Sequence, residues 1–146
     1  MAKVYSVDGM VPVIDPSAFV HPEAVLIGDV VVGPGCYVGP GASLRGDMGR
    51  VELKEGANLQ DNCIMHCFPN ASCIVGVNGH IGHGAVLHGC VVEDDAMVGM
   101  NAVVMDDAVI GVQAIVAACA FVPSAMVVEP RTLVGGMPAK FMRALT

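Results

Sequence analysis

Aliphatic residues recur along this chain with a period of six. One stands at position i of each hexad: Val20, Leu26, Val32, Val38, Leu44, Leu53, Leu59, Met65, Ile81, Leu87, Val92, Val98, Val104, Ile110, Val116 and Val122. Position i+4 is usually Ala, Cys or Val, and it is Met48 after Leu44. A period of six fits neither a helix nor a free strand, but it is the repeat of a parallel β-helix. The pattern predicts an all-β, left-handed parallel β-helix, in which three hexads form a triangular coil with positions i and i+4 inside. The alternative is a β-sandwich with chance periodicity.

The corners and interruptions of this pattern carry further predictions. Glycines at i+1 suit tight corners: Gly33, Gly39, Gly99 and Gly111. Residues 49–52 read as a small bulge, and residues 67–80 as a longer loop excursion with one strand from Cys73 to Val77. The corner after Leu87 is one residue short. Loops that leave a solenoid often lie on its functional face.

The hexad pattern fades near the C-terminus. We therefore assign residues 1–128 to the β-helix and residues 129–146 to a C-terminal segment. Pro138 is followed by AKFMRAL, which predicts the start of a short helix that packs back on the coils.

Composition narrows the classes of function. The 146 residues suggest one domain and carry 14 acidic and 7 basic side chains, for a formal charge of −7. That balance argues against nucleic acid or an anionic membrane as the main partner. Ala108 to Val128 contains no charge and is long enough to span a bilayer. However, it includes Gly111 and Pro123 and continues the hexad pattern, so we do not expect a membrane segment.

The cysteines and the N-terminus indicate a cellular compartment. None of the six cysteines forms a C-x-x-C motif or a zinc-finger spacing. Lys3 and Asp8 interrupt the first residues, so no signal peptide is evident. Together these features predict reduced thiols in a cytoplasmic protein.

Coil arithmetic places two histidines on one ridge. The outward neighbours of the inward residues on one face are Ile27, Arg45, His66, His88, Met105 and Pro123. Successive coils stack about 4.8 Å apart, and two imidazole nitrogens on one tetrahedral zinc lie about 3.3 Å apart. His66 and His88 are therefore candidate ligands of one metal ion. Ordinary solvated histidines are the alternative.

A third histidine points to an assembly. His83 belongs to the preceding face, so its side chain should point away from His66 and His88. Three prisms packed side by side would bring His83 of one subunit against His66 and His88 of the next, which predicts a homotrimer with three interfacial metal sites. Three histidines with an open fourth position are a catalytic arrangement, able to produce hydroxide at neutral pH. The ligand set suits Zn²⁺, Fe, Co or Ni.

Other reactive side chains fit simpler roles. His21 and His80 lie outside this column, and we expect His80 to cap or hydrogen-bond the loop. Cys36 and Cys63 occupy inward slots, where cysteine acts as a small hydrophobic residue. Cys67, next to His66, is the exception, because oxidation or stray metal binding could occur there.

Several motifs together resemble the gamma-class carbonic anhydrases. They are R-G-D at residues 45–47, N-L-Q-D at 58–61, M-H at 65–66 and I-G-H-G-A-V-L-H-G at 81–89. D-G-x-x-P-V-I-D-P near the start and G-x-P-A-K near the end resemble one branch of that family, the phenylacetate-degradation (PaaY) and carnitine-operon (CaiE) proteins. The likeness extends over nearly the whole chain. Hexapeptide repeats alone would also suggest acyltransferases, so the spaced histidines with R-x-D and Q-D carry the specificity.

The resemblance implies a role for each motif residue. The ligands of zinc, or of another divalent metal, would be His66, His83 and His88, with His83 donated across the interface. Arg45 and Asp61 would form an ion pair between subunits. Gln60 would lie near the metal-bound water, where an amide can donate or accept a hydrogen bond. Asp47 would support the ligands or lie at the interface.

The chain also departs from that family pattern. The glutamate that follows R-x-D in the archetypal enzyme, where it helps to move protons, is Met48 here. Residues 68–79 contain no acid, so the acidic loop is missing. Without a nearby proton shuttle, proton release could limit CO2 hydration. Position 67 is Cys where the branch usually has Gly, and the longer helical tail that the resemblance implies would place Thr146 within a helix.

Four functions remain open at this point. The first is a carbonic-anhydrase-like lyase that hydrates CO2 reversibly with metal-bound hydroxide. The second is a thioesterase that uses the same site on acyl-CoA, favoured by the missing shuttle acids. The third is a metal-free hexapeptide acyltransferase with a histidine as general base. The fourth is a trimeric scaffold without catalysis. The first three act on a small molecule.

Overall fold

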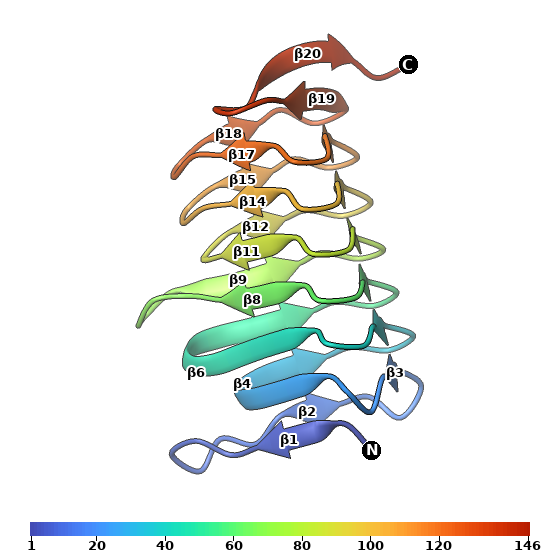
Figure 1. The fold of residues 1–146 in the computed structure, drawn as a ribbon, viewed down its shortest axis with the longest axis vertical. Coiled ribbons are helices and arrows are strands. Elements are labelled where there is room, and N and C mark those ends of the chain that lie inside the picture. Colours follow the sequence, from blue (N-terminus) through green and yellow to red (C-terminus); the bar gives the residue numbers. More distant parts are fainter.

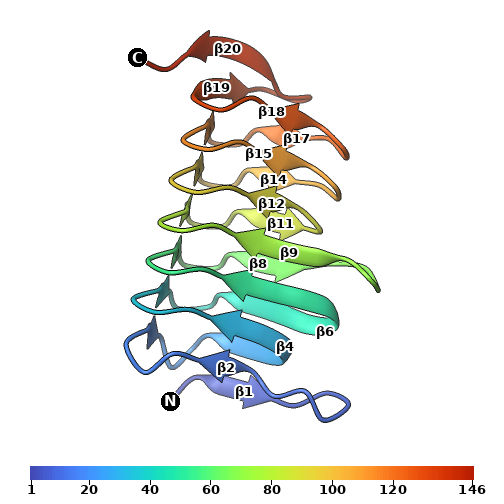
Figure 2. The same ribbon diagram turned by 180° about the vertical axis from the view of Figure 1, so that it is seen from behind.

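The computed structural model describes all 146 residues as a left-handed parallel β-helix of about seven turns. The strands lie on three faces of a triangular prism, and the two termini lie at its opposite ends (Figures 1 and 2). The all-β prediction is confirmed. The structure contains no helix that could cross a bilayer, and the uncharged stretch from Ala108 to Val128 forms short strands of the coils.

Each face is a stack of strands that run parallel, except for β20 at the end of the third face. The first face contains β1 (Lys3–Tyr5), the starts of β4 (Val25–Val32) and β6 (Ser43–Leu53), β8 (Ile64–His66), β11 (Val86–His88), β14 (Val103–Val104) and β17 (Phe121–Val122). The second contains β2 (Val13–Ile14), the ends of β4 and β6, β9 (Ser72–Val75), β12 (Val91–Val92), β15 (Val109–Ile110) and β18 (Val127–Val128). The third contains β3 (Phe19–Val20), β5 (Tyr37–Val38), β7 (Asn58–Leu59), β10 (His80–Ile81), β13 (Met97–Val98), β16 (Ile115–Val116), β19 (Thr132–Gly135) and β20 (Lys140–Ala144).

The register of the first face matches the hexad arithmetic. Its aligned inward residues are Leu26, Leu44, Met65, Leu87, Val104 and Val122, each paired with the next. All six are fully buried within a single hydrophobic core. Because large residues stack on large ones and small i+4 residues stack on small ones, each coil has the same thickness and the next coil fits on it.

The glycines at i+1 serve close packing rather than turn geometry. Gly33 and Gly99 have ordinary backbone angles, but a Cβ at either would lie within 3 Å of backbone atoms in the next coil. The left-handed backbone conformation occurs two residues later, at i+3, for example at Asn62 and Asn101. Asn, Asp and Gly tolerate that conformation best.

The bulge changes the orientation of Met48. Gly28 pairs with Gly46, but Val30 pairs with Val51, so residues 47–50 of β6 face only Asp29 of β4. Val51 therefore takes the inward slot that the hexad pattern gave to Met48, and Met48 is 54% exposed. The prediction that Met48 fills the core was wrong, because the insertion moves the phase by three residues.

The excursion predicted for residues 67–80 is shorter than expected. β9 pairs with β6 and β12, so it belongs to the second face, and its bounds are Ser72–Val75 rather than Cys73–Val77. Val75 lies six residues before Ile81 and is fully buried, so the hexad phase in fact extends back to it. Of residues 67–80, only the β8–β9 loop, residues 67–71, protrudes from the prism (Figure 2).

The predicted C-terminal helix is absent. β19 continues the third face beyond residue 128 by pairing with β16, and β20 then returns antiparallel along β19. Residues 140–144 therefore pair with the edge of the last coil, whose backbone donors and acceptors would otherwise lack partners. The residues after Pro138 favour a helix locally, but the free strand edge determines their conformation.

Candidate metal centre

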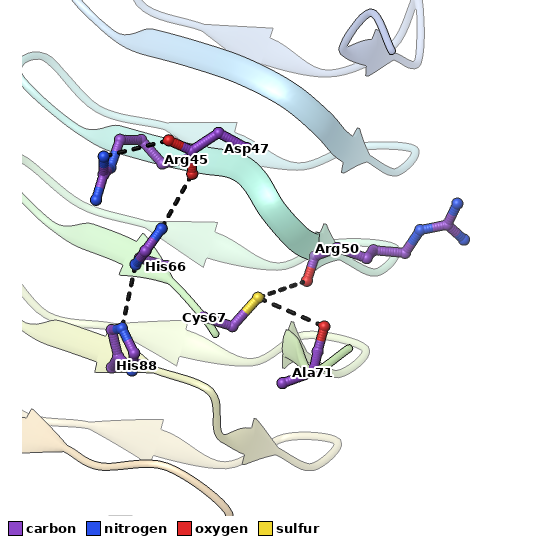
Figure 3. Close-up of polar contacts among 7 residues, drawn as sticks. All are labelled: Arg45, Asp47, Arg50, His66, Cys67, Ala71 and His88. Carbon is purple, nitrogen blue, oxygen red and sulfur yellow. Dashed lines mark hydrogen bonds and ion pairs between the residues drawn. The ribbon is translucent and has the colours of Figure 1, made fainter. Parts of the chain in front are cut away.

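His66 and His88 lie side by side at the ends of two neighbouring strands. His66 ends β8 and His88 ends β11, and the two residues are paired in the parallel register. Nδ1 of His66 lies 3.1 Å from Nε2 of His88, and both side chains point out from the first face (Figure 3). The predicted ridge is confirmed, and the separation is close to the value of about 3.3 Å for two nitrogens on one tetrahedral metal.

Each of these histidines forms a hydrogen bond to a carboxylate through its other ring nitrogen. Nε2 of His66 donates to Oδ1 of Asp47 over 3.0 Å, and Nδ1 of His88 donates to Oδ1 of Asp106 over 2.7 Å. Asp47 belongs to β6, and Asp106 follows β14, so the two carboxylates flank the histidine pair from the coils on either side. Metal-ligating histidines commonly have such a carboxylate partner, which orients the ring.

This hydrogen-bond pattern determines which nitrogens are free. A carboxylate only accepts hydrogen bonds, so in the neutral rings the protons lie on Nε2 of His66 and Nδ1 of His88. The two facing nitrogens then both present lone pairs, which repel at 3.1 Å unless a cation lies with them. The pair therefore fits a divalent metal ion, and the other ring nitrogens are already engaged.

The bulge of β6 and the β8–β9 loop surround the histidine pair. His66 is 9% exposed, and the ring of Phe68 meets His88 edge-on with 4.8 Å between centroids. Cys67 is buried and its Sγ lies 3.7 Å from the carbonyl oxygen of Arg50 and 3.5 Å from that of Ala71 (Figure 3). The thiol thereby connects the bulge that carries Asp47 with the β8–β9 loop that carries Phe68.

Cys67 is not the reactive thiol that the sequence suggested. Burial raises the pKa of Cys67 to about 11, so the nucleophilic thiolate is scarce at neutral pH. Cys36 and Cys63 are buried in inward slots, as predicted, and burial raises the pKa of each thiol too. Cys119 is the one exposed cysteine.

His83 lies apart from the pair, as expected. It occupies the corner after β10, its side chain is 52% exposed, and its Nδ1 lies 3.6 Å from Oδ1 of Asp61. No three histidine, cysteine, aspartate or glutamate side chains of this chain gather as a metal-binding group. A single chain thus supplies two converging nitrogens and one exposed histidine elsewhere.

The remaining predicted residues divide between the two locations. Nη1 of Arg45 pairs with Asp47 over 3.2 Å within the chain, and its expected pairing with Asp61 of another subunit stays a prediction. Gln60 lies near His83 on the third face and donates to Nε2 of His80 over 3.1 Å. The prediction that His80 serves the loop was wrong, because β10 belongs to the third face and turns the ring toward Gln60. His21 accepts a hydrogen bond from the amide of Glu23, away from both locations.

Sequence reasoning missed Asp106. The coil arithmetic assigned the outward position to Met105 and did not extend to the next residue at the corner. The signal was nonetheless present, because the shortened corner after Leu87 lies directly over residues 106 and 107. The deletion leaves space beside His88 that a side chain of the next coil can enter.

Comparison with known proteins places this geometry in a family. The model of the bacterial transferase hexapeptide family, six repeats, matches residues 12–46. The carnitine operon protein CaiE of Escherichia coli O157:H7 is 58% identical over 142 residues, which cover 97% of this chain and 72% of the relative. CaiE of Shigella flexneri matches with the same identity and coverage. The chain belongs to the CaiE family of hexapeptide-repeat proteins.

Solved structures agree with the fold of this CaiE-family chain. A hexapeptide transferase family protein from Anaplasma phagocytophilum is 36% identical with a TM-score of 0.93, over 99% of this chain and 85% of the other. A Bacillus cereus protein, provisionally described as an acetyltransferase, is 33% identical with a TM-score of 0.98, over 99% and 84%. The CaiE relatives are described as carnitine operon proteins, which specifies an operon and no reaction.

Proposed function

We propose that this CaiE-family protein is a metal-dependent enzyme of the gamma-carbonic-anhydrase type that hydrates CO2 reversibly. The observation that carries the proposal is the pair of facing nitrogens of His66 and His88, 3.1 Å apart with a carboxylate on each opposite nitrogen. An acyltransferase that uses one histidine as a base needs no such convergence. A bound Zn²⁺, or Fe, Co or Ni, would supply an activated water nucleophile at neutral pH.

The proposed site is completed by a neighbouring subunit in a homotrimer. Proteins of the hexapeptide transferase family are typically trimeric. His83 is exposed, and Asp61 lies near its Nδ1, so its Nε2 is the atom available to a second chain. Packing the corner that carries His83 against the first face of a neighbour would add the third nitrogen to His66 and His88.

The other side chains of the proposed site orient the histidines or bind the substrate. Asp47 holds His66, and Arg45 in turn holds Asp47. Gln60 lies with His83 on the third face, where its amide would bind an oxygen of CO2 or bicarbonate at the assembled interface. Arg45 and Asp61 would pair across that interface. Met48 cannot move protons, so proton release is expected to limit the rate, and small buffers should increase it.

Metal content tests the proposal directly. The protein, prepared without a histidine tag or chelator, is expected to hold close to one divalent metal per chain. His83→Ala should lose most of that metal although its own His66 and His88 remain, whereas the matched control His21→Ala should retain it. Elemental analysis after gel filtration gives both values. Full metal content in His83→Ala would contradict the shared site, and metal-free wild-type protein would contradict the proposal.

One observation favours acyl-CoA thioester hydrolysis as a second candidate function. A cavity of about 290 Å³ adjoins His83 and Gln60, with Met97, Met100 and Ile115 among its mostly apolar walls. CO2 needs far less room, whereas an acyl chain would bury apolar surface there. Stopped-flow CO2 hydration and a series of CoA thioesters of increasing acyl length separate the two. Turnover that increases with acyl length supports thioester hydrolysis, and CO2 hydration alone supports the first proposal.

A metal-free acyltransferase and a non-catalytic scaffold remain the weaker alternatives. PerB from Caulobacter crescentus, solved in complex with CoA and GDP-perosamine, is 26% identical with a TM-score of 0.69, over 92% of this chain and 58% of PerB. Saturable acyl transfer by the metal-free protein would support the first alternative. Turnover of neither substrate class by metal-loaded protein would support the second. Cytoplasmic location and the absence of nucleic-acid and membrane partners stay predictions.

A further inference from the structure

We propose that Asp106 is a positioning residue that keeps the proton of His88 on Nδ1 and thereby leaves Nε2 free to face His66. The hydrogen bond from Nδ1 of His88 to Oδ1 of Asp106 measures 2.7 Å, which is the shortest of those around the pair. Both side chains are mostly buried. The inference rests on the proposed metal site and adds a residue that the motif comparison did not include.

The shortened corner after Leu87 makes room for this contact. Gly89 adopts the left-handed conformation with φ of +58°, and a Cβ there would collide with Oδ1 of Asp106. The amide of Asp107 donates to the carbonyl oxygen of Gly89 over 2.8 Å, which fixes the two corners together. The corner is one residue shorter than a full hexad, and Gly89 has no side chain. Both features allow Asp106 to approach His88.

The position of this proton decides whether the pair is open to a metal. If the proton were on Nε2 of His88, that nitrogen would donate directly to Nδ1 of His66, since the two atoms are already at hydrogen-bond distance. A hydrogen bond would then close the pair and would have to be broken before a metal could bind. Asp106 prevents this by accepting the proton on the opposite side of the ring.

Two variants distinguish loss of the hydrogen bond to His88 from loss of one negative charge near the site. Asp106→Ala removes the acceptor, and Asp107→Asn removes one charge from the next residue, which is exposed and does not contact a histidine. Asn also suits the left-handed conformation of position 107. Competitive titration with a chromogenic Zn²⁺ chelator should show about 10- to 100-fold weaker binding for Asp106→Ala and wild-type affinity for Asp107→Asn.

A second readout requires no metal. Long-range ¹H–¹⁵N spectra of the metal-free protein, which distinguish the two neutral tautomers, should show His88 protonated on Nδ1 in the wild type and on Nε2 in Asp106→Ala. Wild-type protein with the proton on Nε2 would overturn the inference, as would an Asp106→Ala variant with an unchanged tautomer. If the wild type binds no Zn²⁺ but shows the expected tautomers, the metal enzyme fails while the role of Asp106 stands. A lower melting temperature of a variant would identify loss of the folded structure, rather than loss of the hydrogen bond, as the cause of weaker binding.

Discussion

His66 and His88 are oriented by neighbours that lie one coil away on either side. The stacking of coils brings Asp47, His66, His88 and Asp106 into one line of hydrogen bonds and facing nitrogens. The hexad period was enough to predict that His66 and His88 are adjacent, because their spacing follows from their inward neighbours. It could not predict ring tautomers or the contribution of Asp106, because these depend on a corner where the period is interrupted.

A prediction at this scale concerns the thiol of Cys67. Burial raises its pKa from 9.0 to about 11, so between these values the folded chain keeps a proton that the unfolded chain has lost. The free energy of unfolding should therefore decrease as the pH rises from about 9 to about 11, by about 2–3 kcal/mol for this group. Urea denaturation from pH 8 to 11 measures it. A Cys67→Ala variant, which lacks this thiol, should lose correspondingly less, and an equal loss in both proteins would contradict the assignment.

At the scale of the strand, burial of the inward column stabilises each coil. Ile110 on β15 is fully buried, while its neighbour Val109 on the same strand is only partly buried. Ile110→Ala should reduce the free energy of unfolding by about 2–5 kcal/mol, and the matched Val109→Ala should cost about 1 kcal/mol or less. Urea unfolding curves of the two variants provide the comparison. Equal losses would contradict the assigned inward and outward positions.

The elements were predictable wherever the chain contacts only its neighbouring coils. Period six placed Leu44, Met65 and Leu87 in one column because each packs on the next. It placed Met48 wrongly, since an insertion inside β6 changes the phase without leaving the sheet. β20 was predicted as a helix because the residues after Pro138 favour one locally. The prediction failed because β20 pairs with the free edge of β19, and an edge has no signature in a periodic pattern.

At the scale of the whole molecule, the proposed metal ligands lie at two locations that one chain keeps apart. The histidine pair and His83 occupy different parts of the prism, so the proposed site exists only where two subunits meet. The sequence predicted this division because the coil arithmetic assigns His83 to a different face. The trimer itself was inferred from the need for a third ligand, so it requires a direct test.

A mixture of two variants, each expected to bind little metal alone, tests whether two subunits share one metal site. His83→Ala keeps the pair, and His88→Ala keeps His83, so each variant alone should hold little metal. When the two are unfolded together in equal amounts, refolded and dialysed against Zn²⁺, about one interface in four should combine an intact pair with an intact His83. The mixture is therefore expected to hold about a quarter of the wild-type metal content. A mixture that stays as empty as its parents, although trimeric and folded, would contradict the shared site.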